Sequence, residues 1–217
     1  MRKSQLVIKR IIDFIVSLFL LVTLAPLFLT IAIIIKITSG GPVIFKQKRP
    51  GLNAEVFEVF KFRTMKPGSE TMIAGKEVLS DDDRVTFIGK YLRRFKVDEL
   101  PQIINVIRGE MSLVGPRPER IASLDDYTEE IAKRLNMLPG MTGLAQVSGN
   151  IHLTLLDRYK FDVYYVEHYR LILDLKIIVR TIGVILFGED KYIERALVAF
   201  PQRSNNNDVS REEQPVK

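Results

Sequence analysis

Residues 14–35 read FIVSLFLLVTLAPLFLTIAIII, an apolar run without a charged side chain. Sixteen of its twenty-two residues are Leu, Ile, Val or Phe, which meets the length criterion for a membrane segment. At about −0.3 to −0.6 kcal/mol per apolar residue, insertion is favoured by roughly 5 to 10 kcal/mol, against ~3 kcal/mol for a helix-interior proline such as Pro26. A cleaved signal peptide would have a shorter apolar core that ends in small residues, whereas Lys36 follows three isoleucines here.

Basic residues flank both ends of this run: Arg2, Lys3, Lys9 and Arg10 before it, and Lys36, Lys46, Lys48 and Arg49 after it. Positive charge beside a membrane segment favours the cytoplasmic side, and here both ends favour it. Pro26 removes a backbone donor and disfavours helical geometry at Ala25, so a helix that breaks there and returns to its own side satisfies both flanks. A kinked helix that spans the bilayer is the alternative, and the residues alone favour neither.

The segment after the apolar run predicts a β-hairpin. Residues 43–47 and 56–63 have strand-like composition and are separated by the turn-forming Pro50-Gly51-Leu52-Asn53. Lys61 and Arg63 would then share one face of the second strand. Residues 66–83 are polar and predict a loop or lid.

Helical spacing of apolar residues predicts the remaining elements. Core-facing helices are expected from two sets, Val85, Ile88, Leu92 and Phe95, and Ile121, Leu124, Ile131, Leu135 and Leu138, with Pro139–Gly143 ending the second helix. Between Glu167 and Gly188 the apolar residues fall on one face, while the other carries Arg170, Asp174, Lys176 and Arg180. This pattern predicts a membrane-surface helix, although a helix packed on a soluble core has the same pattern. From Pro201 onward the tail is polar and predicted to be disordered.

Composition limits the chemistry. The chain has no cysteine, which excludes thiol catalysis, thiolate metal sites and disulfides. His152 and His168 have no spacing typical of a zinc site. The net charge of +6 suits nucleic acid, an anionic membrane surface or a phosphorylated substrate equally well.

Asp98-Glu99-Leu100-Pro101 precedes an apolar run that Gly109 is expected to end. Because proline belongs in a first helical turn, the two carboxylates are predicted at a helix N-terminus. There the helix dipole favours ionised carboxylates and free amides favour a bound phosphate. The structural alternative is an acidic helix start with Asp98 as the N-cap.

Arg117 lies between two prolines in Gly115-Pro116-Arg117-Pro118. The prolines restrict the backbone on either side, so the guanidinium has a fixed direction that suits a diphosphate. A salt bridge that pins the loop is the alternative. Further cations near the acidic pair are Lys61, Arg63, Arg93 and Arg94. Together these residues predict a phosphate-handling site, with a magnesium ion between carboxylate and phosphate oxygens.

Five segments carry a resemblance to a known family. They are GPVIFKQKRPG (41–51), FKFRTM (60–65), DELPQ (98–102), GEMSLVGPRP (109–118) and PGMTGLAQV (139–147). In this order they resemble the bacterial sugar transferase family, the monotopic phosphoglycosyl transferases, over about residues 5–187.

The resemblance implies transfer of a sugar 1-phosphate from a nucleoside diphosphate sugar, usually a UDP sugar, to undecaprenyl phosphate. It also implies a re-entrant membrane helix, an Asp-Glu dyad that matches Asp98 and Glu99, and magnesium held by Asp98. In the family the aspartate is the nucleophile that becomes bound to the phosphosugar, which assigns Asp98 that role. Glu99 would then support proton or metal handling.

The same resemblance implies further site residues. Lys61, Arg63, Arg93 and Arg117 match family basic positions near the phosphates, and Gln146 and Asp162 fall in matching segments. Two positions depart from the family pattern. Many members have Ser-Pro at the membrane break where this chain has Ala25-Pro26, and many have an arginine where this chain has Asn150, at a position expected to contact phosphate or nucleotide.

We therefore expect a mainly α fold with a small β-hairpin, a monotopic membrane protein with a re-entrant broken N-terminal helix and amphipathic surface helices. The expected parts are a membrane-embedded helix (1–37), a catalytic domain (38–188) and a polar tail (189–217). The expected location is the cytoplasmic face of a bacterial inner membrane. Membrane lipids and both substrates are the expected partners, with downstream glycosyltransferases as candidates and no nucleic acid.

Two other functions agree less well with the sequence. A catalytically silent scaffold that recruits glycosyltransferases would not need the intact acidic pair or the oriented Arg117. A basic nucleic-acid binder lacks a recognition motif and does not explain the apolar run.

Overall fold

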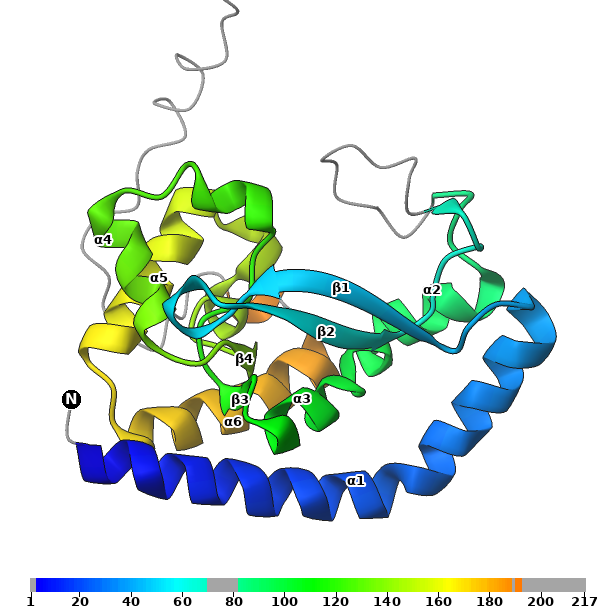
Figure 1. The fold of residues 1–217 in the computed structure, drawn as a ribbon, viewed down its shortest axis with the longest axis horizontal. Helices are drawn as coiled ribbons and strands as arrows, with labels where there is room; N and C mark the ends of the chain where they lie inside the picture. Colours follow the sequence, from blue (N-terminus) through cyan, green and yellow to red (C-terminus); the bar gives the residue numbers. More distant parts are fainter. Residues whose placement is uncertain (1–2, 70–81, 189, 193–217) are drawn as a thin grey trace, which may run out of the picture.

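The computed structural model describes residues 3–69, 82–188 and 190–192. In this part the protein is mainly helical, with the predicted hairpin and a second small sheet. Figure 1 shows α1 (Lys3–Ser39) along one edge, with most other elements on one side of it. Most of the predicted loop at 66–83 and nearly all of the predicted tail at 189–217 lie outside the described residues.

α1 is one continuous helix of 37 residues with Pro26 inside it. Figure 1 shows a bend between a longer N-terminal arm and a shorter C-terminal arm. Proline lacks an N–H and clashes with the carbonyl four residues earlier, so it bends a helix that other contacts keep intact. The Thr30 hydroxyl donates to the Pro26 carbonyl at 2.9 Å. The break expected at Ala25 and Pro26 is therefore a bend within a continuous helix, and a re-entrant path stays a prediction.

The apolar surface of α1 faces outward. Among the residues that the structure describes, α1 is the one helix long and apolar enough to cross a membrane, and only 11% of its apolar window is buried. The side chains that it does bury are Lys9, Asp13, Ser17, Ile31 and Ile35. A core helix of a soluble protein would be mostly buried, so this exposure indicates membrane association.

β1 (Ile44–Pro50) and β2 (Val56–Phe62) form the predicted antiparallel hairpin. The register pairs Ile44 with Phe62 at the open end. The turn contains Asn53 at φ 53°, a left-handed value that asparagine tolerates.

The acidic pair lies in η3 (Val97–Glu99), a single turn that precedes α3 (Gln102–Arg108). Pro101 is the N-cap residue of α3 rather than part of its first turn, so the pair lies one turn earlier than predicted and Asp98 is not an N-cap. α3 ends, as predicted, at Gly109, whose φ of 87° favours glycine.

α2 (Phe87–Arg94) confirms a helix in the first of the two predicted core-facing segments, but Val85 lies before it and Phe95, its C-cap residue, is 54% exposed and does not face the core. The Thr86 hydroxyl caps it by accepting the Gly89 N–H at 3.0 Å. Leu92 is buried in a cluster with Ile35 of α1 and Phe62 of β2. α2 therefore packs against the C-terminal arm of α1.

The second predicted core-facing helix is wrong as one element. The structure has η4 (Ile121–Leu124), α4 (Glu129–Ala132) and η5 (Lys133–Asn136) instead. The Thr128 hydroxyl accepts the Ile131 N–H at 3.3 Å and starts a new helix there. A capping side chain offers the backbone an alternative to continuing the previous turn.

β3 (Ser112–Val114) and β4 (Gly140–Thr142) pair in parallel, with Ser112 opposite Gly140. The sequence predicted only a helix end at β4. A Cβ on Gly140 would lie 2.1 Å from the Gly115 nitrogen, so the two backbones approach too closely for any side chain there. This contact fixes the start of the loop that carries Arg117.

α5 (Leu155–Glu167) and α6 (Leu171–Phe187) complete the main core. α6 confirms the predicted helix, and its exposed apolar residues are Ile172, Leu175, Ile178, Val179, Ile182, Ile185, Leu186 and Phe187. Asp174, expected on a solvated polar face, is instead buried, because its carboxylate accepts Lys9 Nζ of α1 at 2.6 Å. α6 thus lies beside the N-terminal arm of α1 (Figure 1).

Candidate active site

The structure brings together three segments of the chain at Glu99. Glu99 Oε1 accepts Lys61 Nζ at 2.6 Å and Arg117 Nη2 at 3.3 Å. Lys61 comes from β2, and Arg117 from the loop after β3. Its neighbour Asp98 is 9% exposed. The predicted acidic pair and two of the predicted cations therefore form one cluster.

The two carboxyl groups have different acidities. Burial opposes ionisation of Glu99, but the charges of Lys61 and Arg117 outweigh it and hold its pKa below the ordinary value. Burial, followed by the charge of Glu99, raises the pKa of Asp98 to about 6. Glu99 is therefore a permanent anion, whereas Asp98 titrates close to neutral pH. Pairs of carboxyl groups with separated pKa values are typical of sites that perform acid, base or nucleophilic chemistry.

Arg93 of α2 is the third predicted cation near the pair. Its Nε donates to the Thr64 hydroxyl at 2.8 Å. Its charge also partly offsets the raised pKa of Asp98. The guanidinium of Arg63, another predicted cation, packs over Gly41. A Cβ on Gly41 would come within 2.5 Å of Arg63 Nη1.

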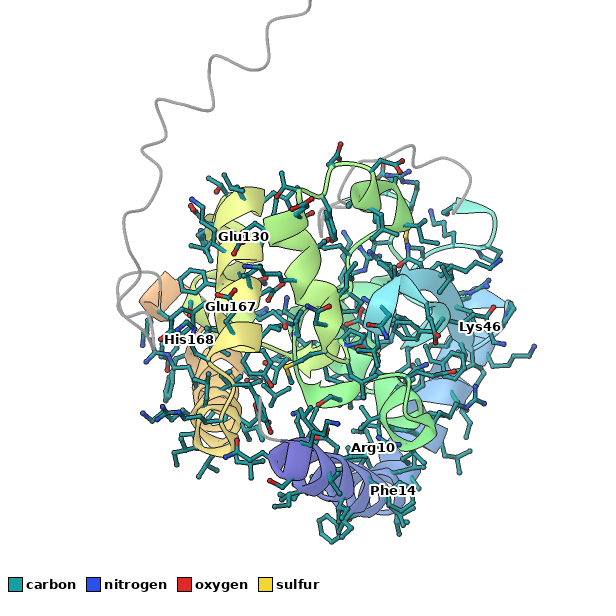
Figure 2. The ribbon with its side chains drawn as sticks, turned by 60° about the vertical axis from the view of Figure 1, so that its left-hand side comes forward. Arg10, Phe14, Lys46, Glu130, Glu167 and His168 are labelled. Atoms are coloured by element: carbon teal, nitrogen blue, oxygen red, sulfur yellow. The ribbon has the colours of Figure 1, made fainter. Side chains whose placement is uncertain are left out.

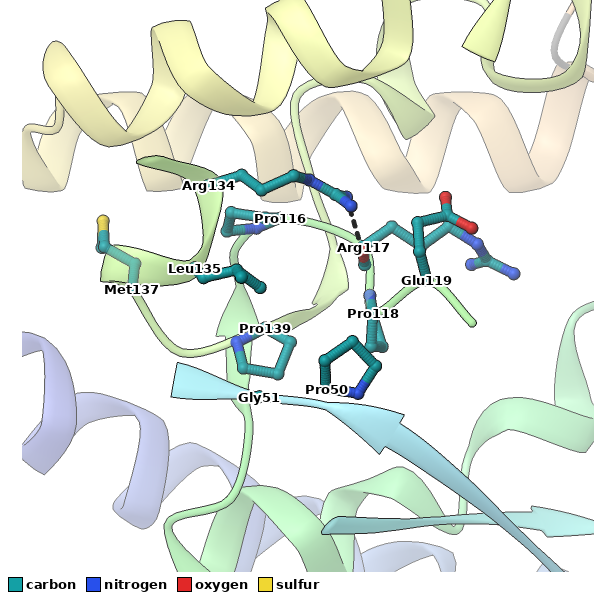
Figure 3. Close-up of a pocket in the computed structure, with 10 residues that line it drawn as sticks. All are labelled: Pro50, Gly51, Pro116, Arg117, Pro118, Glu119, Arg134, Leu135, Met137 and Pro139. Atoms are coloured by element: carbon teal, nitrogen blue, oxygen red, sulfur yellow. Dashed lines mark hydrogen bonds between the residues drawn. The ribbon is translucent and has the colours of Figure 1, made fainter. Parts of the chain in front are cut away.

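Arg117 is fixed through its backbone as well as its side chain. Arg134 Nη2 donates to the Arg117 carbonyl oxygen at 2.7 Å, as the dashed line in Figure 3 shows. Figure 3 also shows the Arg117 side chain extending away from a small pocket lined by prolines, among them Pro50, Pro116 and Pro139. The guanidinium that meets Glu99 therefore projects from a rigid loop.

Gln146 and Asp162 lie outside the cluster around Glu99. Gln146, in the segment after β4, donates its Nε2–H to the carbonyl oxygen of Met141 in β4 at 3.2 Å. Asp162 of α5 is 1% exposed and forms an ion pair with Arg134 at 2.5 Å. Asp162 reaches the site only through Arg134 and the Arg117 backbone.

Sequence reasoning missed two arginines near Arg117. Arg134 falls in a short basic stretch that resembles a solvated helix face, and nothing local reveals that it is buried. Arg49 ends the basic part of β1, and burial together with the charge of Arg117 lowers its pKa to about 10. Arg49 lies in the segment 41–51 that resembles the family, and this position could have indicated that it belongs to the site.

The acidic pair fits a magnesium ion bound together with substrate phosphates. Among the described residues no group of three His, Cys, Asp or Glu side chains is placed to hold a metal ion. Magnesium commonly needs only one or two protein carboxylates when phosphate oxygens and water complete its shell. Asp98 and Glu99 provide that number.

Comparison with known proteins agrees with this arrangement. Residues 4–188 match the family described as Bacterial sugar transferase. The chain belongs to the bacterial sugar transferase family. The match includes all of α1 except Lys3, the hairpin and every residue of the cluster around Glu99.

Curated relatives of this sugar transferase cover most of its length. The uncharacterized sugar transferase EpsL of Bacillus subtilis (strain 168) is 38% identical over 85% of this chain and 90% of its own. The UDP-glucose:undecaprenyl-phosphate glucose-1-phosphate transferase of Caulobacter vibrioides is 40% identical over 85% of this chain and 72% of its own. The undecaprenyl-phosphate glucose phosphotransferase of Komagataeibacter xylinus is also 40% identical, but the match spans only 37% of that longer protein.

One departure from the family pattern has a structural explanation in this sugar transferase. Asn150 has a φ of 43°, and its N–H donates to the Ala145 carbonyl oxygen at 3.1 Å. Asparagine adopts left-handed backbone more readily than most residues. The residue is 8% exposed, so its side chain is buried in this turn.

Proposed function

We propose that this sugar transferase moves a sugar 1-phosphate from a nucleoside diphosphate sugar, with UDP as the expected nucleotide, to undecaprenyl phosphate. The reaction would start the assembly of a lipid-linked glycan. The acceptor is carried over from the names of the relatives in Caulobacter vibrioides and Komagataeibacter xylinus. The observation that carries the proposal is the adjacent carboxyl pair, in which Lys61 and Arg117 hold Glu99 ionised while Asp98 titrates near neutral pH.

The proposed reaction has two displacements at one phosphorus atom. In the first, an Asp98 carboxylate oxygen bonds to the sugar-bearing phosphorus, the bond to the nucleoside phosphate breaks, and nucleoside monophosphate leaves. In the second, an oxygen of undecaprenyl phosphate bonds to the same phosphorus and the bond to Asp98 breaks. The carboxylate is restored, and the product is an undecaprenyl diphosphate sugar. Splitting the transfer lets the water-soluble nucleoside monophosphate leave before the lipid reacts.

The charges of the site suit this chemistry. Asp98 and the diphosphate are both anionic, so their approach needs compensating positive charge. Arg117 and Lys61 meet at Glu99, and the positive charge of Arg93 on α2 acts on Asp98. Glu99 keeps the two cations at fixed positions beside the nucleophile. Magnesium bound at Asp98 would supply further charge for the phosphate oxygens.

The membrane supplies the second substrate. The exposed apolar residues of α1 and α6 would lie in lipid, on the cytoplasmic side of a bacterial inner membrane. Lys9, Arg10 and Asp13 of the N-terminal arm of α1 contact the protein body, while Ile31 and Ile35 of the C-terminal arm pack against the same body. A re-entrant path accounts for both contacts. Downstream glycosyltransferases would use the product.

A covalent adduct tests the proposed function. Detergent-solubilised protein incubated with a panel of nucleotide sugars and magnesium, without lipid acceptor, should gain the mass of a sugar phosphate. The gain should be absent in Asp98→Asn, retained in the exposed-residue control Asp125→Asn, and reversed by undecaprenyl phosphate. An adduct in Asp98→Asn would move the nucleophile elsewhere. A protein that releases no nucleoside monophosphate, with or without acceptor, would instead match a silent scaffold.

A further inference from the structure

A buried ion pair lies directly behind Arg117. Arg134 Nη2 meets Asp162 Oδ2 at 2.5 Å and the Arg117 carbonyl oxygen at 2.7 Å. Both side chains of the pair are 2% exposed. Burial raises the pKa of Asp162 to about 6, while the charge of Arg134 and, to a smaller extent, the nearby Arg117 peptide N–H lower it. The pair therefore holds the Arg117 carbonyl oxygen through Arg134, and Asp162 lies near the N–H of the same peptide.

The guanidinium of Arg134 is itself held in one orientation. It lies 4.6 Å from the ring centre of Tyr159 and 5.5 Å from that of Tyr127. Its Nη1 donates to the Tyr127 hydroxyl. Aromatic rings on a planar cation restrict its tilt, and the hydroxyl restricts its rotation.

The location of this pair matters because the segment Pro116–Pro118 offers few backbone hydrogen bonds besides the one that its Pro116 carbonyl oxygen accepts from the Gly140 N–H at 2.9 Å. Pro116 and Pro118 carry no N–H, so within this three-residue segment Arg117 alone can donate a backbone hydrogen bond. Its side chain reaches Glu99 at 3.3 Å, the outer limit of a good contact. A small shift of the loop would therefore separate Arg117 from Glu99.

We propose that Arg134 and Asp162 are positioning residues, a buried ion pair that holds the Arg117 peptide and so places its guanidinium beside Glu99 and the substrate diphosphate. The inference rests on the proposed function, in which Arg117 meets the diphosphate. It gives Asp162 a role through Arg117 instead of a direct contact with substrate. The competing explanation is that the pair only joins α5 to η5.

A double-mutant cycle distinguishes the two explanations. We expect Asp162→Asn and Arg117→Ala each to lower kcat/KM on the order of 10- to 100-fold, the size of effect that small misplacement produces. If Asp162 acts through Arg117, the double variant should be no worse than Arg117→Ala within about twofold. Losses that multiply would overturn the proposal, because a merely structural pair acts independently of Arg117.

Controls separate positioning from stability. Asp174→Asn also removes a buried, paired carboxylate, but one that faces Lys9, so its effect should multiply with that of Arg117→Ala. If Asp162→Asn does not fold, Tyr127→Phe removes only the hydroxyl that holds Arg134. We expect a smaller loss from Tyr127→Phe that also disappears in the Arg117→Ala background, and a loss that persists there would overturn the proposal.

Amide hydrogen exchange tests the contact without the reaction. In Asp162→Asn the Arg117 amide should exchange at least about tenfold faster than in the wild type, while amides of α3 keep their rates. Unchanged exchange at Arg117 would overturn the inference even in an active enzyme. A wild-type protein that turns over no nucleotide sugar would instead reject the proposed function, and the exchange result would still decide whether the pair holds the loop.

Discussion

Asp98 and Glu99 are neighbours in the chain, yet different groups control their charges. Lys61 and Arg117 donate hydrogen bonds to Glu99. Asp98 is buried beside the negative charge of Glu99, and both effects raise its pKa. A carboxylate destabilised in this way is a better nucleophile when ionised, because attack on phosphorus relieves part of the unfavourable charge. The ionised Asp98 carboxylate therefore lowers the stability of the folded protein.

This residue-scale balance predicts a pH-dependent gain of stability in Asp98→Asn. The pKa of Asp98 rises from 3.8 to about 6 on folding, so the folded protein binds the proton more tightly than the unfolded chain. Stability from this group is present at acid pH and is lost as pH rises through about 6. In metal-free detergent solution at pH 7, Asp98→Asn should be more stable than the wild type by about 1 to 3 kcal/mol, measured by thermal unfolding.

The matched control is Glu99→Gln, which removes the anion that Lys61 and Arg117 share and should destabilise the protein at pH 7. The advantage of Asp98→Asn should shrink toward pH 4. An advantage that stays constant between pH 4 and pH 7 would contradict a raised pKa at Asp98.

The residues of the site were predictable in part. The acidic pair and Arg117 stand in short motifs whose local chemistry is visible in the sequence, and the structure brings them together with Lys61. Arg134 was not predictable, since its burial depends on Asp162, Tyr127 and Tyr159 from other segments. A local pattern cannot show which charge will be covered by distant residues.

At the scale of elements, α3 joins the long apolar helix α1 to the acidic pair. Its N-terminal end follows η3, and its C-terminal end accepts hydrogen bonds from Arg10 of α1. Arg10 Nη1 donates to the Val106 carbonyl oxygen at 2.6 Å, and Nη2 to that of Ile107 at 3.0 Å. Figure 2 shows Arg10 at the junction of α1 with the rest of the protein. A cation at a helix C-terminus also interacts favourably with the helix dipole.

Arg10→Met should therefore lower the free energy of unfolding by about 1 to 3 kcal/mol, because two helix-end carbonyls lose a charged donor. The stability of Arg10→Lys should lie between those of Arg10→Met and the wild type, since one ammonium group cannot reproduce the two hydrogen bonds of the guanidinium. Lys3→Met, which removes an exposed cation from the same helix, is the control and should change stability by less than about 0.5 kcal/mol. Thermal unfolding in detergent measures all three. Equal effects of Arg10→Met and Lys3→Met would show that the cap does not matter.

Elements were predictable where one local pattern determined them. The hairpin has a turn between two strand-like runs, and α6 has a long apolar repeat. The helix expected across 121–138 failed because Thr128 begins a new helix within it. The β3–β4 pair was missed because each strand has three residues, too few to show alternation, and their pairing joins segments far apart in the chain.

At the scale of the whole molecule, polar contacts attach the apolar helix α1 to the rest of the described protein, residues 40–69, 82–188 and 190–192, which we call the catalytic body. Asp174 accepts both Lys9 Nζ and the Tyr165 hydroxyl, and Asp13 accepts the Ser112 hydroxyl at 2.7 Å. These buried polar groups face the body, which leaves the apolar side chains of α1 and α6 on the outside. Buried polar groups that satisfy one another specify a single docking geometry more than they add stability.

This docking leads to the prediction that both ends of α1 are cytoplasmic. Lys9 and Asp13 hold the N-terminal arm on the body, and Ile31 and Ile35 hold the C-terminal arm on it. A helix that crossed the bilayer would have to pull one arm away and expose the buried charges to lipid, which is unfavourable by several kcal/mol. The bend that Pro26 introduces lets both arms stay in contact.

Single cysteines in this cysteine-free chain can test the topology. Ser4→Cys and Thr38→Cys mark exposed positions at the two ends of α1, and Asp125→Cys marks the catalytic body. Ser39 is less suitable than Thr38 for labelling, because its hydroxyl is buried. All three thiols should resist a membrane-impermeant reagent added outside intact cells and react once the cells are permeabilised. Labelling of Ser4→Cys alone would establish a spanning helix. Labelling of Thr38→Cys and Asp125→Cys would instead place the catalytic body outside the cytoplasm, where no nucleotide sugar could reach Asp98.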